Sequence, residues 1–281
     1  MKTSDPASLA LIVLWGGLAL GLVLGAAGQA SRFCVRGAIA DWVVFRTPGR
    51  ALSWLLAVAV AAVATQAVIS LQWFDAGRTL PWSSSFLWLS HLVGGLVFGF
   101  GMILASGCPQ RNLVKAGSGN LRALVVLLVA AVVAAMTLRG LLAVPRVGLL
   151  DVMGVQLQGS QDLGAVGARL LGLPATALRW GLALALAALA LVLVLRHRAA
   201  MGAGLLVGSV IVGLLVPAAY LLTGNLGFLP EHPETLEAAW MGTQSRRPEG
   251  LTFAAPLAHS LDLLTLWSDK TMVPTFGVML A

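Results

Sequence analysis

The stretch ASGCPQRNLVKAGSG, residues 105–119, decides the fold class because it places a helix break and polar side chains between two long apolar runs. The runs cover roughly 87–106 and 121–143, and each is long enough to cross a bilayer as a helix. Gly107 is predicted to end the first helix. Pro109 is predicted to begin a short new one, since proline is favoured at the first helical position. The stretch therefore indicates a short helix set between two membrane spans.

Cys108 is predicted to be the N-cap residue of this short helix. Free backbone N–H groups and the positive end of the helix dipole favour an anion at that position. The side chains that follow add hydrogen-bond donors, and they are Gln110, Arg111 and Asn112. These residues are therefore candidates for an anion-binding site.

The same pattern occurs earlier, in SRFCVRGAIADW at residues 31–42. Aligning Cys34 with Cys108 gives two copies of Gly-x3-Gly, eight residues and Cys, with glycines at 21 and 25 and at 95 and 99. Arg36 adds a cation beside the first cysteine, and Gly37 is predicted to break its helix. Repeats that bring two unwound helix ends together near the bilayer midplane are typical of transporters. We therefore predict an all-α, polytopic integral membrane protein with pseudo-symmetric helix and half-helix repeats.

The composition excludes an ordinary soluble domain. Hydrophobic residues make up 58% of the chain and charged residues 10%, whereas a soluble domain has about 45–50% and about 25%. The net charge of +7 does not indicate nucleic-acid binding, because the basic residues lie at the ends of apolar runs, as topology control requires. The chain is therefore predicted to lie in the lipid bilayer and to bind no nucleic acid.

We predict a single transmembrane domain over residues 1–281, incomplete at its C-terminus because an apolar run starts at 272 and stops early. The polar segment 144–178 is predicted to be an external loop with an interfacial helix near 162–172. The predicted spans are about 20 residues each and lie near 9–30, 51–71, 87–106, 121–143, 179–195 and 204–223.

Three basic connections, at 31–50, 107–122 and 196–203, are predicted to face the cytoplasm by the positive-inside rule. This orientation puts the N-terminus in the periplasm and the chain in a bacterial inner (plasma) membrane. Asp41, the single carboxylate in these connections, is interpreted as the salt-bridge partner of Arg36 or a neighbouring arginine and not as a proton carrier.

The two cysteines suggest what kind of anion passes. A thiol is soft, polarizable and only weakly hydrogen-bonding. An oxyanion with a soft terminal sulfur could pass from one thiol to the other without being held tightly, as a passage site requires. The chain has no Walker A, GxGxxG or HExxH motif, and the cysteines form no metal-ligand cluster, so no cofactor, metal or catalytic residue is predicted.

At these residues the chain resembles the YeeE/YedE family of sulfur-transport membrane proteins. The resemblance rests on RFCVRGAIADW, ASGCPQRNLVKAGSG, GSVIVGLLVPAAYLLTGNLGF and the segment from Arg246 to Ala281. It implies an hourglass-shaped, all-helical protein in which half-helices point at a central constriction. It also implies thiosulfate uptake, with cysteines at the constriction relaying the anion. Cys34 and Cys108 match two such cysteines, and the family's usual third lies beyond the point where this sequence stops.

The leading hypothesis is therefore a permease, not an enzyme, that imports thiosulfate or a related small sulfur anion. By analogy, a soluble sulfur-carrier or rhodanese-like protein is an expected partner. One alternative is a membrane carrier that holds persulfide sulfur, or selenium, and hands it to a cytoplasmic sulfurtransferase. Another is a membrane scaffold whose cysteines only pack.

Overall fold

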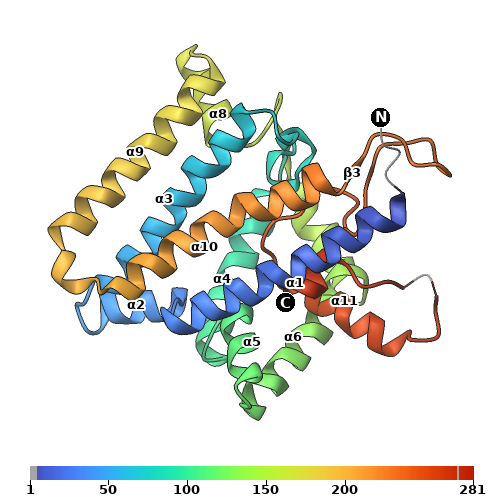
Figure 1. Cartoon of the computed structure of the whole chain (residues 1–281), viewed down its shortest axis with the longest axis horizontal. Coiled ribbons are helices and arrows are strands. Elements are labelled where there is room, and N and C mark those ends of the chain that lie inside the picture. Colours follow the sequence, from blue (N-terminus) through green and yellow to red (C-terminus); the bar gives the residue numbers. More distant parts are fainter. Residues whose placement is uncertain (1–4, 271) are drawn as a thin grey trace.

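The computed structural model describes residues 5–270 and 272–281, and it is mostly helical (Figure 1). Within these residues, six helical segments are long and apolar enough to cross a membrane. Each overlaps one predicted span, so the prediction of a polytopic helical protein is confirmed at this level. The segments are Pro6–Val43, Gly49–Ser70, Trp88–Gly117, Leu121–Arg139, Ala175–Arg196 and Ala203–Leu226.

Two of the six segments are composite. The first consists of the long helix α1 (Pro6–Ala30) and the short helix α2 (Val35–Val43). The third consists of α4 (Trp88–Leu104) and α5 (Pro109–Gly117). The uninterrupted long helices are α3 (Gly49–Ser70), α6 (Leu121–Arg139), α9 (Ala175–Arg196) and α10 (Ala203–Leu221), the last of which continues into a π-helical turn at Leu222–Leu226.

Shorter elements connect the long helices. Helix α7 (Ala143–Pro145) follows α6, and α8 (Leu163–Leu171) confirms the helix predicted near 162–172. Two antiparallel pairs of two-residue strands depart from the all-helical prediction, and both lie outside the six candidate spans. The pairs are β1 (Ser85–Phe86) with β2 (Val155–Gln156) and β3 (Phe228–Leu229) with β4 (Ala239–Trp240).

Helix α3 packs against both α9 and α10 (Figure 1). Gly213 of α10 permits this approach, since a Cβ there would lie 2.7 Å from the carbonyl oxygen of Ala57. Small residues serve the same purpose generally in membrane helices, where backbones approach closely. A hydroxyl pair, Ser53 with Ser209 at 2.7 Å, is buried in the same interface.

The two C-terminal helices pack against two of the long helices. Helix α11 (Ala254–Thr265) packs against α6, and α12 (Phe276–Leu280) packs against α1. The apolar run predicted from 272 is thus a short helix in this structure, with Phe276 fully buried. By contrast, no residue of α4 is buried, so α4 has little cover from the described part of the chain.

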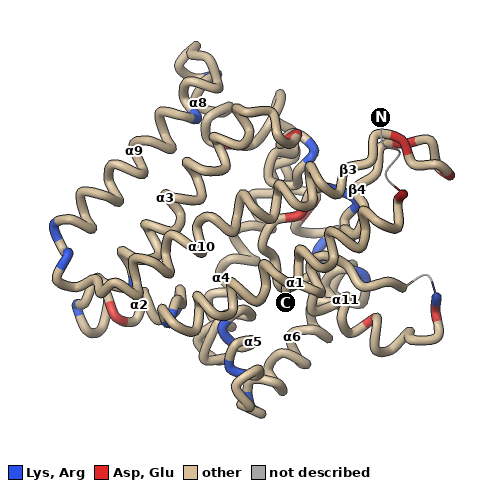
Figure 2. Tube along the Cα trace, in the orientation of Figure 1, with Lys and Arg blue, Asp and Glu red and all other residues tan. Residues whose placement is uncertain are grey.

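The basic connections 31–50 and 196–203 lie at the same end of the bundle. Buried Leu52, Val194 and Met201 form one apolar cluster there. Figure 2 shows Lys and Arg positions at this end and along α5.

Candidate functional site

The two cysteines occupy equivalent positions in the local structure. Cys34 is the N-cap residue of α2 and Cys108 is the N-cap residue of α5, and both side chains are half-buried. Pro109 is the first residue of α5. The predicted N-cap position of Cys108 is thereby confirmed, together with the predicted place of Pro109. Each thiol thus stands at the positive end of a nine-residue helix.

The connection before each cysteine also has the same backbone. We name residues 31–34 the first break and residues 105–108 the second break. The residue two before each cysteine is left-handed, with φ of 51° at Arg32 and 54° at Ser106. In the first break the N–H of Phe33 donates to Gly28 O at 3.1 Å. The equivalent bond in the second break runs from the N–H of Gly107 to Met102 O at 3.0 Å. This is the Schellman pattern of helix termination, which satisfies carbonyls that the broken helix would leave free.

Of the two glycines predicted to break helices, Gly107 lies in the second break and Gly37 does not lie in a break. The left-handed residue of the second break is Ser106, and Gly107 follows it. A Cβ on Gly107 would lie 3.3 Å from Cβ and Cγ of Arg111, so glycine makes room for that side chain. Gly37 lies inside α2 and interrupts no helix. A Cβ there would lie 2.5 Å from Nη1 of Arg50, so this glycine also makes room for an arginine.

Arginine side chains connect the two helix units, α1–α2 and α4–α5. Arg36 of α2 donates to the carbonyl oxygen of Ser106 at 3.5 Å. In the opposite direction, Arg111 of α5 donates to Oε1 of Gln29 on α1 at 3.1 Å. Each cysteine-bearing unit therefore reaches the other with one guanidinium.

The remaining predicted site residues belong to the second break. Nε2 of Gln110 lies 3.1 Å from the position of a Cβ on Gly28, so Gln110 also faces α1. Asn112 is buried and donates to the carbonyl oxygens of Gly107 at 3.1 Å and Ala105 at 3.4 Å. Its amide nitrogen therefore helps to hold the break together.

Lys115 also binds the second break, although it was not among the predicted site residues. Nζ of Lys115 donates to the carbonyl oxygen of Ser106 at 2.6 Å, the same oxygen that Arg36 reaches. The signal available in the sequence was spacing, because residues seven apart, such as Cys108 and Lys115, lie on one face of a helix. In the first unit, Asp41 pairs with Arg50 at 3.0 Å, which confirms the interpretation of Asp41 as a salt-bridge partner.

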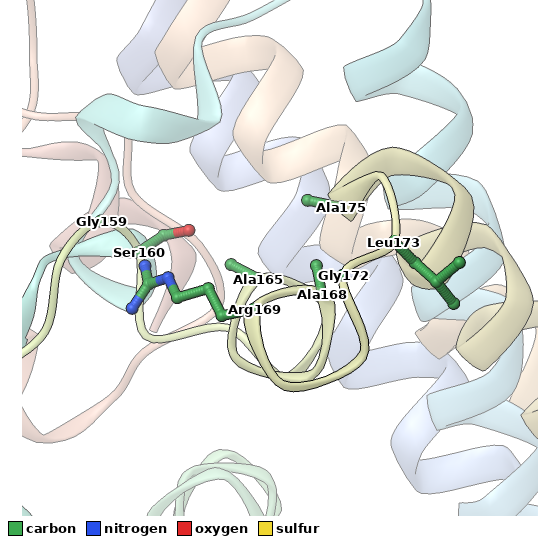
Figure 3. Close-up of a pocket in the computed structure, with 8 residues that line it drawn as sticks. All are labelled: Gly159, Ser160, Ala165, Ala168, Arg169, Gly172, Leu173 and Ala175. Carbon is green, nitrogen blue, oxygen red and sulfur yellow. The ribbon is translucent and has the colours of Figure 1, made fainter.

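A cavity of about 460 Å³ lies away from the cysteines, beside α8 (Figure 3). None of the predicted site residues lines it. Figure 3 shows Arg169 extending from α8 toward Gly159 and Ser160. The lining is otherwise small or apolar, and it includes Ala165, Ala168 and Leu173.

The polar anchor of this region is the ion pair between Asp162 and Arg179, with Nε to Oδ2 at 2.8 Å. Partial burial alone would raise the pKa of the Asp162 carboxyl. Hydrogen bonds from Arg179, Ser160 and the N–H of Ala165 outweigh burial and lower this pKa to about 2. Asp162 is thus a fixed negative charge that holds the start of α8 against α9, and it plays no part at the breaks.

The fold and the paired breaks define a polytopic helical membrane protein with two cysteine-capped half-helices. A family model described as Sulphur transport matches residues 30–281, which is most of the chain. The chain therefore belongs to the Sulphur transport family, a family of transporters and not of enzymes. This confirms the resemblance to YeeE/YedE proteins.

Two curated relatives carry the name thiosulfate transporter TsuA. The one from Escherichia coli (strain K12) is 32% identical over 107 residues, which are 38% of this chain and 29% of the relative. The one from Spirochaeta thermophila is 27% identical over 107 residues, 38% of this chain and 31% of the relative. The match thus spans about a third of the length of each relative.

Proposed function

We propose that this protein imports thiosulfate, or a closely related small sulfur anion, through a constriction formed by the two breaks. The observation that carries the proposal is the pair of cysteine N-caps, Cys34 and Cys108, joined by reciprocal arginine contacts. The names of the two relatives support thiosulfate as the substrate.

The chemistry of the breaks suits transient binding of an anion. Two helix N-termini supply partial positive charge, and Arg36, Arg111 and Lys115 add full positive charge nearby. A neutral thiol offers the terminal sulfur a soft, weakly hydrogen-bonding neighbour. We propose that the anion is passed from one thiol to the other, because a passage site must bind its ligand and release it quickly.

The proposal includes an orientation. The short connections at 31–50, 107–122 and 196–203 hold the densest basic residues, which supports a cytoplasmic position for them and a periplasmic N-terminus. The membrane is then the bacterial inner membrane. The two helix and half-helix units, α1–α2 and α4–α5, would be the pseudo-symmetric repeats of a transporter.

The test is growth and labelled thiosulfate accumulation in bacteria that lack their own thiosulfate uptake. Cys108→Ala and Cys34→Ala should each reduce uptake by at least about tenfold, the equivalent of 1.4 kcal/mol. Ser118→Ala, at the far end of α5, is the matched control and should transport normally. Uptake that persists when both cysteines are replaced would remove the thiol relay. Absence of uptake by well-inserted wild type would overturn the thiosulfate proposal.

Mass spectrometry of the purified protein separates this proposal from a persulfide carrier. After exposure to thiosulfate, a carrier would gain about 32 Da, one sulfur atom, on Cys34 or Cys108. A non-covalent relay leaves the mass unchanged. Only the carrier would require a cytoplasmic sulfur-accepting partner for each turnover.

A further inference from the structure

A buried histidine outside the two breaks has an unused nitrogen. His259 of α11 is 4% exposed, and its Nδ1 has no hydrogen-bond partner. In the described part of the chain, Thr275 Oγ1 is the other buried side-chain atom in this condition. Burying a polar atom without a partner is costly, so such an atom in a native fold requires an explanation.

The surroundings of His259 fix which nitrogen is free. Nε2 lies 3.2 Å from the carbonyl oxygen of Val273, which can only accept, so Nε2 carries the hydrogen. Nδ1 is then a bare acceptor. It lies 3.7 Å from Oδ2 of Asp262, a second acceptor and too far for a hydrogen bond. Both atoms are acceptors and no proton lies between them. A proton on Nδ1 would let the imidazole donate a hydrogen bond to Oδ2 of Asp262.

The charged groups around this site are few. Arg139, the last residue of α6, donates to the same Oδ2 of Asp262. Helices α1 and α12 carry no charged residue. Arg111 and Lys115 of α5 are engaged at the breaks, and Asp269 and Lys270 are exposed. A proton on Nδ1 would therefore compete with Arg139 for one carboxylate.

From this geometry we infer that His259, with Asp262 and Arg139, is a proton-binding site that couples proton movement to anion transport. The inference rests on the proposed function, and it supplies the coupling ion for it. Histidine is the side chain whose charge ordinarily changes between about pH 5 and 8. Helix α11 is not one of the six candidate spans, but it packs against the span α6, and ionisable groups buried among membrane helices mark proton pathways.

Packing connects the proton site to the second break. Leu257 and Leu261, on either side of His259 in α11, belong to the same apolar cluster as Leu113 and Ala116 of α5. Helix α5 begins at its N-cap, Cys108. Formation of an Nδ1–H to Oδ2 bond requires the 3.7 Å separation to shorten to about 2.8 Å. Helices α11 and α5 both pack against α6, so we expect a shift of this size at His259 to reach α5 through that helix.

Coupling to a proton would reduce the net negative charge that must enter against the membrane potential. Thiosulfate is a dianion, and a membrane that is negative inside opposes its entry. One proton taken from the periplasmic side onto Nδ1 makes the imidazole cationic, and its release to the cytoplasm restores the neutral ring. No covalent bond to the anion forms, and nothing is oxidised or reduced. Each cycle then carries one negative charge inward instead of two.

The experiment uses the wild-type protein in liposomes, with labelled thiosulfate and a pH dye inside. At zero membrane potential, one coupled proton raises the accumulation ratio about tenfold for each pH unit of outside acidity. Wild type and the control His197→Gln, an exposed histidine after α9, should both show this rise together with internal acidification. His259→Gln should still exchange labelled for unlabelled thiosulfate, but should not respond to the gradient.

Each outcome separates the two proposals. A gradient response by His259→Gln equal to that of wild type would overturn the proton site. So would wild-type uptake that carries no protons into the liposome, a result that needs no variant and stands even if His259→Gln fails to fold. Absence of thiosulfate exchange by folded wild type would overturn the proposed function, and the coupling inference with it.

Discussion

The two breaks share one backbone conformation and are stabilised in different ways. The first break is held mainly by its neighbours, because buried Ser31 packs against Gly208 of α10 and α1 buries five residues. The Ser31 hydroxyl also donates to the carbonyl oxygen of Ala27 at 2.5 Å. The second break is held by its own side chains, since Asn112 and Lys115 bind its carbonyl oxygens and α4 buries none. The position equivalent to Asn112 in the first unit is Ala38, which has no such group. One local geometry can therefore be maintained by packing or by polar contacts.

The two thiols also differ in the hydrogen bonds that they make. Sγ of Cys34 accepts the N–H of Gly37 at 3.5 Å and caps α2. Cys108 occupies the same N-cap position in α5, but its side chain makes no capping hydrogen bond. Cys34 thus caps its helix through a side-chain hydrogen bond, and Cys108 does not.

The largest expected effect tests the packing of the first break. Gly208→Ala places a methyl group against Ser31, and overpacking of this kind costs about 1–3 kcal/mol. Gly204→Ala in the same helix is the control, because nothing lies within 4 Å of a Cβ there. The control should be neutral or stabilise by up to about 1 kcal/mol. Unfolding in detergent, followed by tryptophan fluorescence, measures both. Equal stability of the two variants would show that α10 does not support the first break.

The next effect tests the polar contacts of the second break. Asn112→Ala leaves one buried and one part-buried carbonyl oxygen without their amide donor, which should cost about 1–2 kcal/mol of unfolding free energy. Ser118→Ala, which removes an exposed hydroxyl at the end of the same helix, should cost less than about 0.5 kcal/mol. If Asn112→Ala is as stable as this control, the second break does not depend on its amide.

Much of this arrangement could be predicted from the sequence. The order of apolar runs predicted the six candidate spans, and Gly107-Cys108-Pro109 predicted where α5 begins. The exact position of the left-handed residue could not be predicted. Ser106 and Arg32 take a conformation that glycine prefers, while the adjacent Gly107 is needed for the close approach of Arg111.

The contacts between the breaks could not be predicted either. On position alone, Arg36 and Arg111 are more readily interpreted as lipid headgroup anchors, and only the fold shows that each reaches the other unit. The structure also gives Asn112 and Gly37 contacts that the sequence did not predict. A polar residue beside a candidate site can bind a ligand or the backbone, and a glycine can break a helix or make room for a side chain. Residue type alone does not decide between these roles.

Replacing either cysteine should change the unfolding free energy by a smaller amount. Cys34→Ala removes a capping acceptor and should lower the unfolding free energy by about 0.5–1 kcal/mol. Cys108→Ala should lower it by less, because its thiol caps nothing. Thermal unfolding of both variants in detergent checks the order, and it must accompany the uptake measurements. A larger loss at Cys108 would mean that its thiol has a structural partner, and the contrast between the two thiols would fail.

The smallest effect concerns the backbone that the two breaks have in common. Arg32→Gly and Ser106→Gly relieve a left-handed conformation that costs a non-glycine residue about 1–2 kcal/mol. Glycine also makes the unfolded chain more flexible, which offsets about 0.5–1 kcal/mol of this gain. Each variant should therefore be more stable by roughly 0.5 kcal/mol. Gly119→Ala is the converse control, since Gly119 has φ of 86° and open space around it, and alanine there should destabilise the protein through the backbone alone. Similar gains at Arg32 and Ser106 would establish that the breaks are alike in their backbone. A gain at one position only would show that their supports, packing in the first and polar contacts in the second, extend to the left-handed residue itself.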